Sequence, residues 1–467
     1  MAAATSSSDP NSKSNSLPQV GFIGLGAMGF AMSTHLVKTG FPVRGYDIYG
    51  PTLDRWQSTC NDIPGSRATI AKSPADAVQD VAVVCLMVAN HHHVHSALFD
   101  EKNGAVHSLP KDCTVIVHAT IPLTQPLAVR SRLTDEFKRP DVKLIDVPVS
   151  GGVARSINGT LTIMASSDDP KNLEQPDAKV VLDNLTTKGK TLFIIPGTLG
   201  AGQSAKALNQ VMAGIHIPSA SEIMGLAAVN GLDTKKFYDF LVAKDSAGKQ
   251  RPGWSWMFEN RGPRILSTSP PLASATAIIN KDVGIIQDEE ARLGVELPLL
   301  NKASDVLKEV MKTHAAADDS CVVQWYLGFD SDRSNLVVER GGKPTVAAEQ
   351  QDALIKKVAT AHAIVHLISA YETIKFAKAL DLMHADQRKQ WYNMIAGAAG
   401  GSAIFSAVIP LAFEDADGVD AAFKKFARER FTGDLDNTIS LINHAKEQNY
   451  HPILLEAAVE YLKSFLS

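Results

Sequence analysis

The sequence predicts an α/β domain followed by an all-α helical domain, with a second, degenerate all-α repeat at the C-terminus. Three observations support this fold class. Short apolar runs alternate with helix-like segments over residues 18–198. Residues 200–230 then keep apolar positions at helical spacing for about 30 residues, or roughly 45 Å of continuous helix. Finally, the sequence around residues 216–222 recurs around residues 366–372, which indicates an internal repeat.

We expect five segments along the 467 residues, a length sufficient for several separate cores. They are a disordered tail at 1–17, the α/β domain at 18–198, a helical domain at 199–326, a linker at 327–347 and a second helical domain at 348–467. The tail is rich in Ser and Asn and lacks the apolar core of a signal peptide. The linker is polar and contains glycine.

Composition excludes several classes of function. The formal net charge of −4, with both signs interspersed, gives no reason to expect a nucleic-acid partner. The four cysteines show no paired spacing, so we expect reduced thiols of a cytoplasmic protein and neither disulfides nor a zinc site. The most apolar long run, residues 394–413, is rich in Gly and Ala and contains Pro410. It favours a pair of buried helices over a membrane span.

The first expected strand, residues 19–23, leads into the motif GLGAMG and a helix ending near residue 39. The next strand, residues 42–46, ends in an acid. This order is the fingerprint of a Rossmann dinucleotide-binding domain. The predicted cofactor contacts are Gly24, Gly26, Ala27, Met28, Gly29 and Asp47.

Each part of this motif has a physical role. Gly24 allows the tight turn, Gly26 lets a pyrophosphate approach the helix N-terminus, and Gly29 packs helix against strand. Asp47 would accept hydrogen bonds from the ribose hydroxyls and would repel a 2′-phosphate. Arg44 comes too early in the strand, and on the wrong face, to offset that repulsion. We therefore expect NAD rather than NADP as the cofactor.

The α/β alternation continues through residues 73–76, which have a helix-start pattern, and through three buried strands at 81–88, 114–117 and 144–147. A histidine cluster follows the first of these strands, at His91, His92, His93 and His95. Because no carboxylate or cysteine stands at ligand spacing, we interpret the cluster as a polar loop leading into a helix, with no metal.

Two further elements carry candidate chemistry. Ser150, Gly151 and Gly152 follow a strand, where exposed N–H groups and a hydroxyl would suit a carboxylate, although an ordinary glycine turn explains them equally well. Lys206 and Gln210 stand four residues apart on the long helix and therefore share one face. Spacing alone would make Lys206 a solvated surface charge.

Several motifs then occur in the order of a known family: GLGAMG, HATIP, DVPVSGG with GTLTIM, GAGQSAKALNQ, SWMFENR and NKD. In this respect the chain resembles the β-hydroxyacid dehydrogenases, which include 3-hydroxyisobutyrate dehydrogenase and are related to 6-phosphogluconate dehydrogenase. The resemblance covers about residues 18–320. It implies an NAD-dependent dehydrogenase of a small hydroxy acid.

The resemblance also implies roles for individual residues. Lys206 corresponds to the catalytic lysine, Thr120 lies at the nicotinamide, and Lys281 is a second active-site lysine near both cofactor and substrate. Ser150, Gly151 and Gly152 correspond to the carboxylate-binding turn. Most members carry Asn where this chain has Gln210. The Gln variant resembles threonate dehydrogenases and favours a polyhydroxylated four-carbon acid.

The expected reaction is oxidation of a carbinol, with Lys206 as general base. A free lysine has a pKa of about 10.4, but burial beside NAD⁺ and Lys281 would favour its neutral form. Three alternatives remain open: a dehydrogenase of 3-hydroxyisobutyrate or another β-hydroxy acid, a non-catalytic NAD-binding scaffold, and an imine reductase. The last is disfavoured because that group typically lacks the lysine.

The sequence predicts that the C-terminal segment repeats the first helical domain, at an offset of 150 around residue 216 and of 154 around residue 291. At these offsets Lys206 becomes Lys356 and Lys281 becomes Leu435. Asn209 and Gln210 become Ala359 and Thr360. We therefore expect a catalytically inactive copy that pairs with the first helical domain within the chain. A homodimer of whole chains is compatible with this arrangement.

Overall fold

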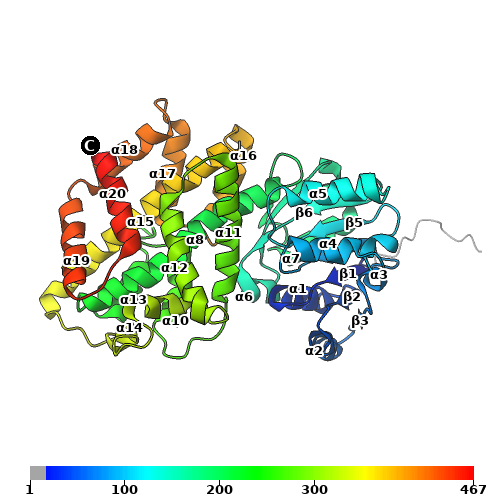
Figure 1. Cartoon of the computed structure of the whole chain (residues 1–467), viewed down its shortest axis with the longest axis horizontal. Coiled ribbons are helices and arrows are strands. Elements are labelled where there is room, and N and C mark those ends of the chain that lie inside the picture. The colour runs from blue at the N-terminus through cyan, green and yellow to red at the C-terminus, as the bar shows by residue number, and fades with distance from the viewer. Residues whose placement is uncertain (1–16) are drawn as a thin grey trace, which may run out of the picture.

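The computed structural model describes residues 17–467, and all but the last residue of the predicted N-terminal tail lies outside that range. Figure 1 shows two lobes, an α/β lobe built from the N-terminal part of the chain and a larger all-α lobe. Helix α8 (Ala201–Val229) leaves the first lobe and runs through the second. This arrangement confirms the predicted fold class.

The α/β lobe is built on one continuous sheet of parallel and antiparallel strands. Its parallel part has the order β3 (Ala68–Ile70), β2 (Val43–Tyr46), β1 (Val20–Ile23), β4 (Val83–Leu86), β5 (Thr114–Val117), β6 (Lys143–Asp146). Strand β8 (Thr162–Ser167) continues the sheet antiparallel to β6 and pairs with β7 (Val149–Ser150) and β9 (Leu192–Ile194). Strands β1, β4 and β5 are buried throughout, as expected for a parallel sheet covered on both faces.

The helices of this lobe are α1 (Ala27–Lys38), α2 (Gly50–Asn61), α3 (Pro74–Ala77), α4 (His91–Phe99), α5 (Gln125–Ser131), α6 (Gly152–Ile157) and α7 (Pro176–Leu185). The Ser73 hydroxyl caps α3 by accepting from the backbone N–H of Asp76, as the sequence indicates. The side chain of Asn90 caps α4 in the same way. The expectation of a polar histidine loop is therefore wrong, because the cap starts the helix at His91.

The first half of the all-α lobe contains α8, α9 (Thr234–Val242), α10 (Trp256–Ile265), α11 (Thr276–Leu293), α12 (Pro298–His314) and α13 (Val322–Leu327). Every residue of α8 from Ala205 onward is buried, so this helix is the axis of the lobe. The segment 327–347, expected to be a linker, contains the short helix α14 (Leu336–Glu339), whose Val337 is buried. The segment is thus partly ordered against its neighbours.

The second half contains α15 (Ala348–Ala379), α16 (Ala385–Ala396), α17 (Ala403–Glu414), α18 (Val419–Phe431), α19 (Leu435–Glu447) and α20 (Ile453–Leu466). The apolar run 394–413 falls on the end of α16 and on α17. By length and composition, α8 and α15 are apolar enough to cross a membrane. In this fold both are core helices, and every residue of the apolar window in α8 is buried.

The two halves of the all-α lobe pair through matching contacts. The buried carboxylate of Glu222 on α8 accepts from the N–H groups of Leu454 and Leu455 at the start of α20, at 2.8 and 2.9 Å. Glu372 on α15 accepts from Leu299 and Leu300 at the start of α12, at 2.6 and 3.0 Å. Each long helix thus supplies the N-terminal cap for a helix of the other half.

This reciprocity is what an internal repeat predicts, because Glu222 and Glu372 are 150 positions apart. The repeat is not exact beyond the long helices. Ser255 and Ser402 both cap helices by accepting an N–H from a phenylalanine three residues later. They are separated by 147 positions. The offset therefore varies along the repeat.

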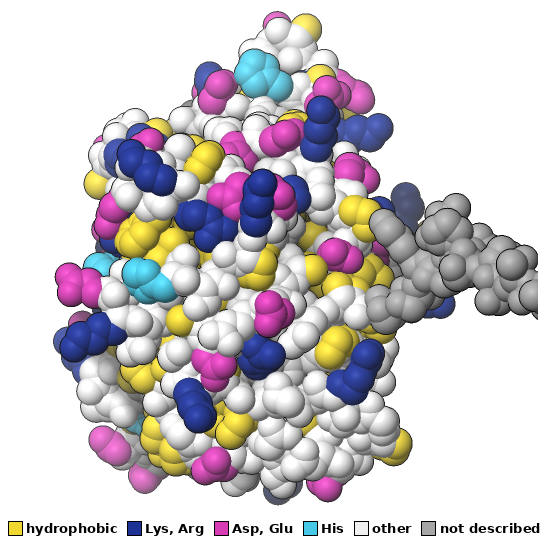
Figure 2. Space-filling view, turned by 90° about the vertical axis from the view of Figure 1, so that its right-hand side faces the viewer, with side chains coloured by type: hydrophobic (Ala, Val, Ile, Leu, Met, Phe, Trp, Pro, Cys, Tyr) yellow, Lys and Arg dark blue, Asp and Glu magenta, His cyan; other side chains and the backbone are white. Residues whose placement is uncertain are grey.

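Surface charge is mixed. Figure 2 shows the face of the α/β lobe seen from the right of Figure 1, where acidic, basic and hydrophobic side chains alternate over short distances. On the face shown, neither sign of charge gathers into an extended patch.

Candidate active site

The glycine turn has the geometry that a dinucleotide requires. Gly24 has a φ of +94°, and a side chain there would collide with the carbonyl of Met87. A side chain at Gly29 would collide with the carbonyl of Gly24, so α1 sits directly against the end of β1. At Gly26 an added Cβ would meet nothing within 4 Å. The open side of the turn thus leaves room for a phosphate at the start of α1.

Asp47 lies at the end of β2 beside this turn. Its carboxylate accepts from the N–H of Leu25 at 2.7 Å and from the N–H of Tyr49 at 2.9 Å. Both bonds hold the carboxylate where the ribose of a dinucleotide would lie. The Arg44 guanidinium instead donates to the carbonyls of Asp76 and Gln79, each at 3.0 Å. It points toward α3 and is therefore not placed to bind a 2′-phosphate.

The Ser-Gly-Gly turn joins β7 to the short helix α6. Ser150 is buried, and Gly151 and Gly152 have φ values of +134° and +68°, a conformation that favours glycine. In the helix that follows, the hydroxyl of Ser156 contacts the sulfur of Met28 at 3.4 Å. The turn predicted to hold the substrate therefore lies against the helix of the dinucleotide turn.

A buried acid fixes the start of α8 to the sheet. Asp146, at the end of β6, accepts from the N–H of Gln203 at 3.1 Å and from its side-chain amide at 2.8 Å. Burial raises the pKa of Asp146 to about 7. Gln203 also donates to the carbonyl of Ala119 and accepts from the N–H of Ile121, at 3.0 and 3.2 Å. These two bonds bracket Thr120 and tie its loop to α8.

Lys206 stands one turn farther along α8 and is only 6% exposed. Its pKa falls from the ordinary value of 10.5 to about 8. Burial is the largest cause and the positive charge of Lys281 adds to it, whereas the negative charge of Asp282 opposes both. A lysine with this pKa exists partly as the neutral amine near physiological pH and can accept a proton.

A hydrogen-bonded chain connects the remaining predicted residues. The side-chain amide of Gln210 donates to Asp282 at 2.6 Å. The ammonium of Lys281 lies 3.1 Å from the same carboxylate and donates to the carbonyl of Thr120 at 3.2 Å. Gln210, Lys281 and Thr120, from three separate parts of the chain, are thus brought together around Asp282.

Three polar residues of this site were not predicted from the sequence as functional. They are Asp146, Gln203 and Asp282. Asp282 directly follows Lys281, and Asp146 opens the segment that ends in the Ser-Gly-Gly turn. Their positions near predicted site residues could have identified them as functional. Burying an acid or an amide costs free energy unless the side chain has hydrogen-bond partners.

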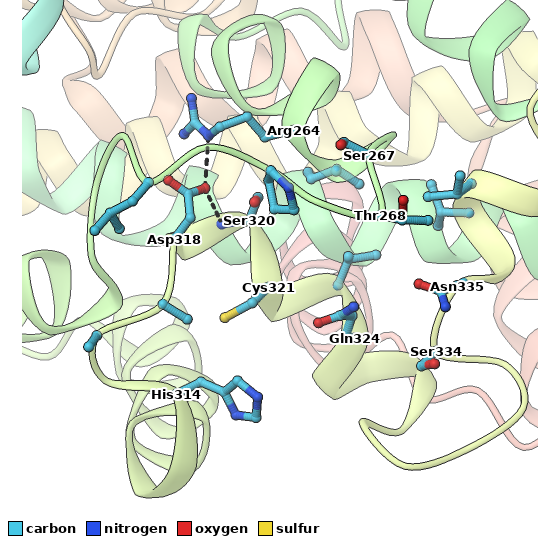
Figure 3. Close-up of a pocket in the computed structure, with 18 residues that line it drawn as sticks. Arg264, Ser267, Thr268, His314, Asp318, Ser320, Cys321, Gln324, Ser334 and Asn335 are labelled. Carbon is cyan, nitrogen blue, oxygen red and sulfur yellow. Dashed lines mark hydrogen bonds and ion pairs between the residues drawn. The ribbon is translucent and has the colours of Figure 1, made fainter.

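A separate cavity lies elsewhere. It has a volume of about 330 Å³ and lies between α10, α13 and α14, with none of the predicted site residues in its wall. Figure 3 shows Arg264 reaching Asp318, an ion pair of 2.8 Å, beside Ser320 and Cys321. The charges in this wall already neutralise one another, so we assign it no catalytic role. Over residues 17–467, no three His, Cys, Asp or Glu side chains gather as metal ligands.

Comparison with known proteins agrees with this geometry. A family model described as the NAD binding domain of 6-phosphogluconate dehydrogenase matches residues 19–195. A second, described as NAD-binding of NADP-dependent 3-hydroxyisobutyrate dehydrogenase, matches residues 200–326. The chain is 32% identical over 313 residues to the L-threonate dehydrogenase of Cupriavidus necator, covering 67% of this chain and 97% of that protein. The chain belongs to the β-hydroxyacid dehydrogenase family.

This β-hydroxyacid dehydrogenase is therefore an NAD-binding oxidoreductase that acts on a CH–OH group. The crystal structure of 3-hydroxyisobutyrate dehydrogenase from Salmonella typhimurium aligns with 66% of this chain and 99% of its own, with a TM-score of 0.55 and 29% identity. The 6-phosphogluconate dehydrogenase of Plasmodium falciparum aligns with 97% of this chain and 93% of its own, with a TM-score of 0.66 and 13% identity. The second similarity is one of fold, and it extends into the C-terminal helices.

Proposed function

We propose that this enzyme uses NAD to oxidise a small, threonate-like hydroxy acid, with Lys206 as the general base. The observation that carries the proposal is the burial of Lys206, which lowers its pKa to about 8 beside Lys281 and Asp282. A base at this pKa can take a proton from a substrate hydroxyl and, in the reverse reaction, return it to a carbonyl oxygen.

The residues divide the work of the proposed reaction. The N–H groups and hydroxyl of residues 150–152 bind the substrate carboxylate, and Gln210 binds a hydroxyl of the substrate. Neutral Lys206 removes the proton of the reacting hydroxyl, and the ammonium of Lys281 stabilises the oxygen as its negative charge develops. Residues 24–29, Asp47 and Thr120 are assigned to the cofactor. NAD⁺, when bound, supplies the acceptor for the hydride that leaves the carbinol carbon.

Gln210 supports a threonate-like acid as the substrate. Its side chain is one methylene longer than the Asn of most relatives, and its amide lies in the polar chain around Asp282. The L-threonate dehydrogenase of Cupriavidus necator, to which the chain is 32% identical, favours the same substrate class. The second candidate is 3-hydroxyisobutyrate, which the match of residues 200–326 supports.

We also propose the domain division 18–198, 199–326, 327–347 and 348–467, in which the last segment pairs with the first helical domain inside one chain. Glu222 and Glu372 each cap a helix of the other half of the all-α lobe, and these contacts support the division. We propose the cytoplasm as the compartment, since the four cysteines are buried and unpaired.

The test is NADH formation by the purified protein with a panel of acids: L- and D-threonate, D-glycerate, 3-hydroxyisobutyrate, 3-hydroxypropionate and 6-phosphogluconate. Each acid is assayed with NAD and with NADP. The proposal expects the highest kcat/KM for a threonate with NAD. Turnover of 3-hydroxyisobutyrate alone would keep the chemistry and reject the role given to Gln210. No turnover, with NAD still bound, would favour the non-catalytic scaffold.

A further inference from the structure

The C-terminal repeat touches the active-site helix at one point beside the proposed catalytic residues. Gly400 lies in the turn between α16 and α17, and its backbone N–H donates to Oδ1 of Asn209 at 2.9 Å. Both residues are buried. Asn209 precedes Gln210 on α8, so a residue 191 positions away in sequence contacts the neighbour of the predicted substrate ligand.

The turn carrying Gly400 is held rigidly. Ser402 pairs with Ser255 as an antiparallel bridge, and two backbone bonds flank the bridge. Trp256 donates to the carbonyl of Gly401 at 2.9 Å, and Ala403 donates to the carbonyl of Trp254 at 3.1 Å. The position of the Gly400 N–H is therefore set by pairing between the two halves of the all-α lobe and not by a free loop.

This N–H determines how the Asn209 amide is turned. Because Oδ1 accepts from Gly400, the NH₂ group of Asn209 is on the opposite side and donates to Oε1 of Gln210 at 2.8 Å. With its oxygen occupied, Gln210 can turn only its own NH₂ group outward. That group donates to Oδ2 of Asp282 at 2.6 Å. One backbone N–H thus orients two side-chain amides in sequence.

We propose that Gly400 of the C-terminal repeat is a positioning residue for the substrate site, which acts through Asn209 and, together with Asp282, holds the donor direction of Gln210. This inference rests on the proposed function, in which Gln210 binds the substrate. It gives the otherwise inactive repeat a part in the chemistry, because Gly400 and Asp282 hold the Gln210 amide from opposite sides.

The orientation defines what Gln210 and Asp282 recognise together. An NH₂ donor beside a carboxylate acceptor matches one hydroxyl group, whose oxygen accepts from Gln210 and whose proton is donated to Asp282. A polyhydroxylated acid supplies such a hydroxyl next to the reacting carbon. The methyl group of 3-hydroxyisobutyrate can neither accept from Gln210 nor donate to Asp282, so we expect a polyhydroxylated acid to be preferred.

The experiment compares Gly400→Ala with Gly397→Ala in the same turn. An added Cβ at Gly400 would lie 3.0 Å from the backbone O and from Oδ1 of Asn209, so the contact must open. At the exposed Gly397 the nearest atom would be the carbonyl oxygen of Asn393 at 3.6 Å, an ordinary contact. For the hydroxy acid turned over by the wild type, Gly400→Ala is expected to lower kcat/KM about tenfold, because one hydrogen bond is lost. The NAD dissociation constant and the Gly397→Ala kinetics should stay within twofold of wild type.

A double-mutant cycle separates orientation from general loosening of the fold. With Asn209→Ala already present, the Gly400 substitution should change kcat/KM by less than twofold, because the chain it acts through is gone. Equal losses in both backgrounds, or a Gly400→Ala enzyme as active as Gly397→Ala, would overturn the proposal. If Gly400→Ala does not fold, Asn209→Asp replaces it, because Asp keeps an acceptor for Gly400 but removes the donor to Gln210. It should raise the KM for the acid about tenfold, and an unchanged KM would count against the proposal.

Failure of the proposed function has a different signature. If the wild type turns over no acid in the panel, the same cycle is measured by thermal unfolding. If the Tm shift of the double variant differs from the sum of the shifts of the two single variants, positions 400 and 209 are coupled and the orienting contact is supported. Additive Tm shifts reject the contact.

Discussion

Replacing Lys206 by Met should stabilise the protein while abolishing its activity. The ammonium of Lys206 is buried on α8, and its pKa is lowered from 10.5 to about 8. At neutral pH the folded state must therefore hold a charge that its surroundings disfavour. Methionine has a similar length and carries no charge, so it removes the cost without leaving a cavity.

The expected size follows from the pKa shift. A shift of about 2.5 units corresponds to about 3 kcal/mol at pH 7, at 1.36 kcal/mol per unit. The folded-state pKa lies below the unfolded value, so the unfolded chain binds more protons between the two. Stability of the wild type therefore rises with pH in this window. The amount by which Lys206→Met exceeds the wild type in free energy of unfolding should fall to roughly 1 kcal/mol at about pH 9.5.

The assay is urea unfolding of wild type and Lys206→Met at these two pH values, with Lys356→Met as the matched control. Lys356 is the exposed counterpart of Lys206 in the second repeat, and its replacement should change stability by less than about 0.5 kcal/mol. Asp282 keeps its ion pair with Lys281 at 3.1 Å in the variant. A Lys206→Met protein that is less stable than wild type, or equally stable at both pH values, would refute the reasoning.

Three other outcomes are expected. First, kcat/KM for oxidation should rise about tenfold per pH unit up to about pH 8 and then level, because the proposed base is the neutral amine of Lys206. A profile that does not change with pH would exclude Lys206 as the base. Second, Asp47→Ser should reduce the preference for NAD over NADP at least about tenfold, measured as the ratio of kcat/KM values, since a repelling carboxylate is removed; an unchanged ratio would place Asp47 away from the ribose. Third, Glu372→Ala should lower the free energy of unfolding by about 2–4 kcal/mol, because two buried N–H groups of α12 lose their acceptor. Thermal denaturation measures this loss, and a change below about 0.5 kcal/mol would show that α12 is capped in another way.

Local signals in the sequence were sufficient to predict the dinucleotide turn. The turn requires glycine where φ is positive or where another backbone atom lies close, as at Gly24 and Gly29. These glycines therefore stand at a fixed spacing that the sequence shows. The cap at Ser73 and the buried strand 114–117 were predicted for the same reason, since each depends on adjacent residues. The error at His91 was also local: the cap at Asn90 was not recognised, although Asn is a favoured N-cap.

Contacts between distant segments could not be predicted in this way. The bond from Gly400 to Asn209 joins parts of the chain that no motif connects. The internal repeat did not help to place Gly400 either. The offset between the two copies changes from 150 at the long helix to 147 at the Ser255 and Ser402 caps. Asp282 is a similar case, since its role depends on Gln210, which lies on another helix.

The most direct test of the account is the rate of NADH formation from L-threonate by the wild type and by Lys206→Ala, with NAD binding measured on both proteins. The account predicts turnover by the wild type, a rate lower by a factor of about 10²–10⁴ for Lys206→Ala, and unchanged NAD affinity. Equal rates for the two proteins would contradict the assignment of Lys206 as the base.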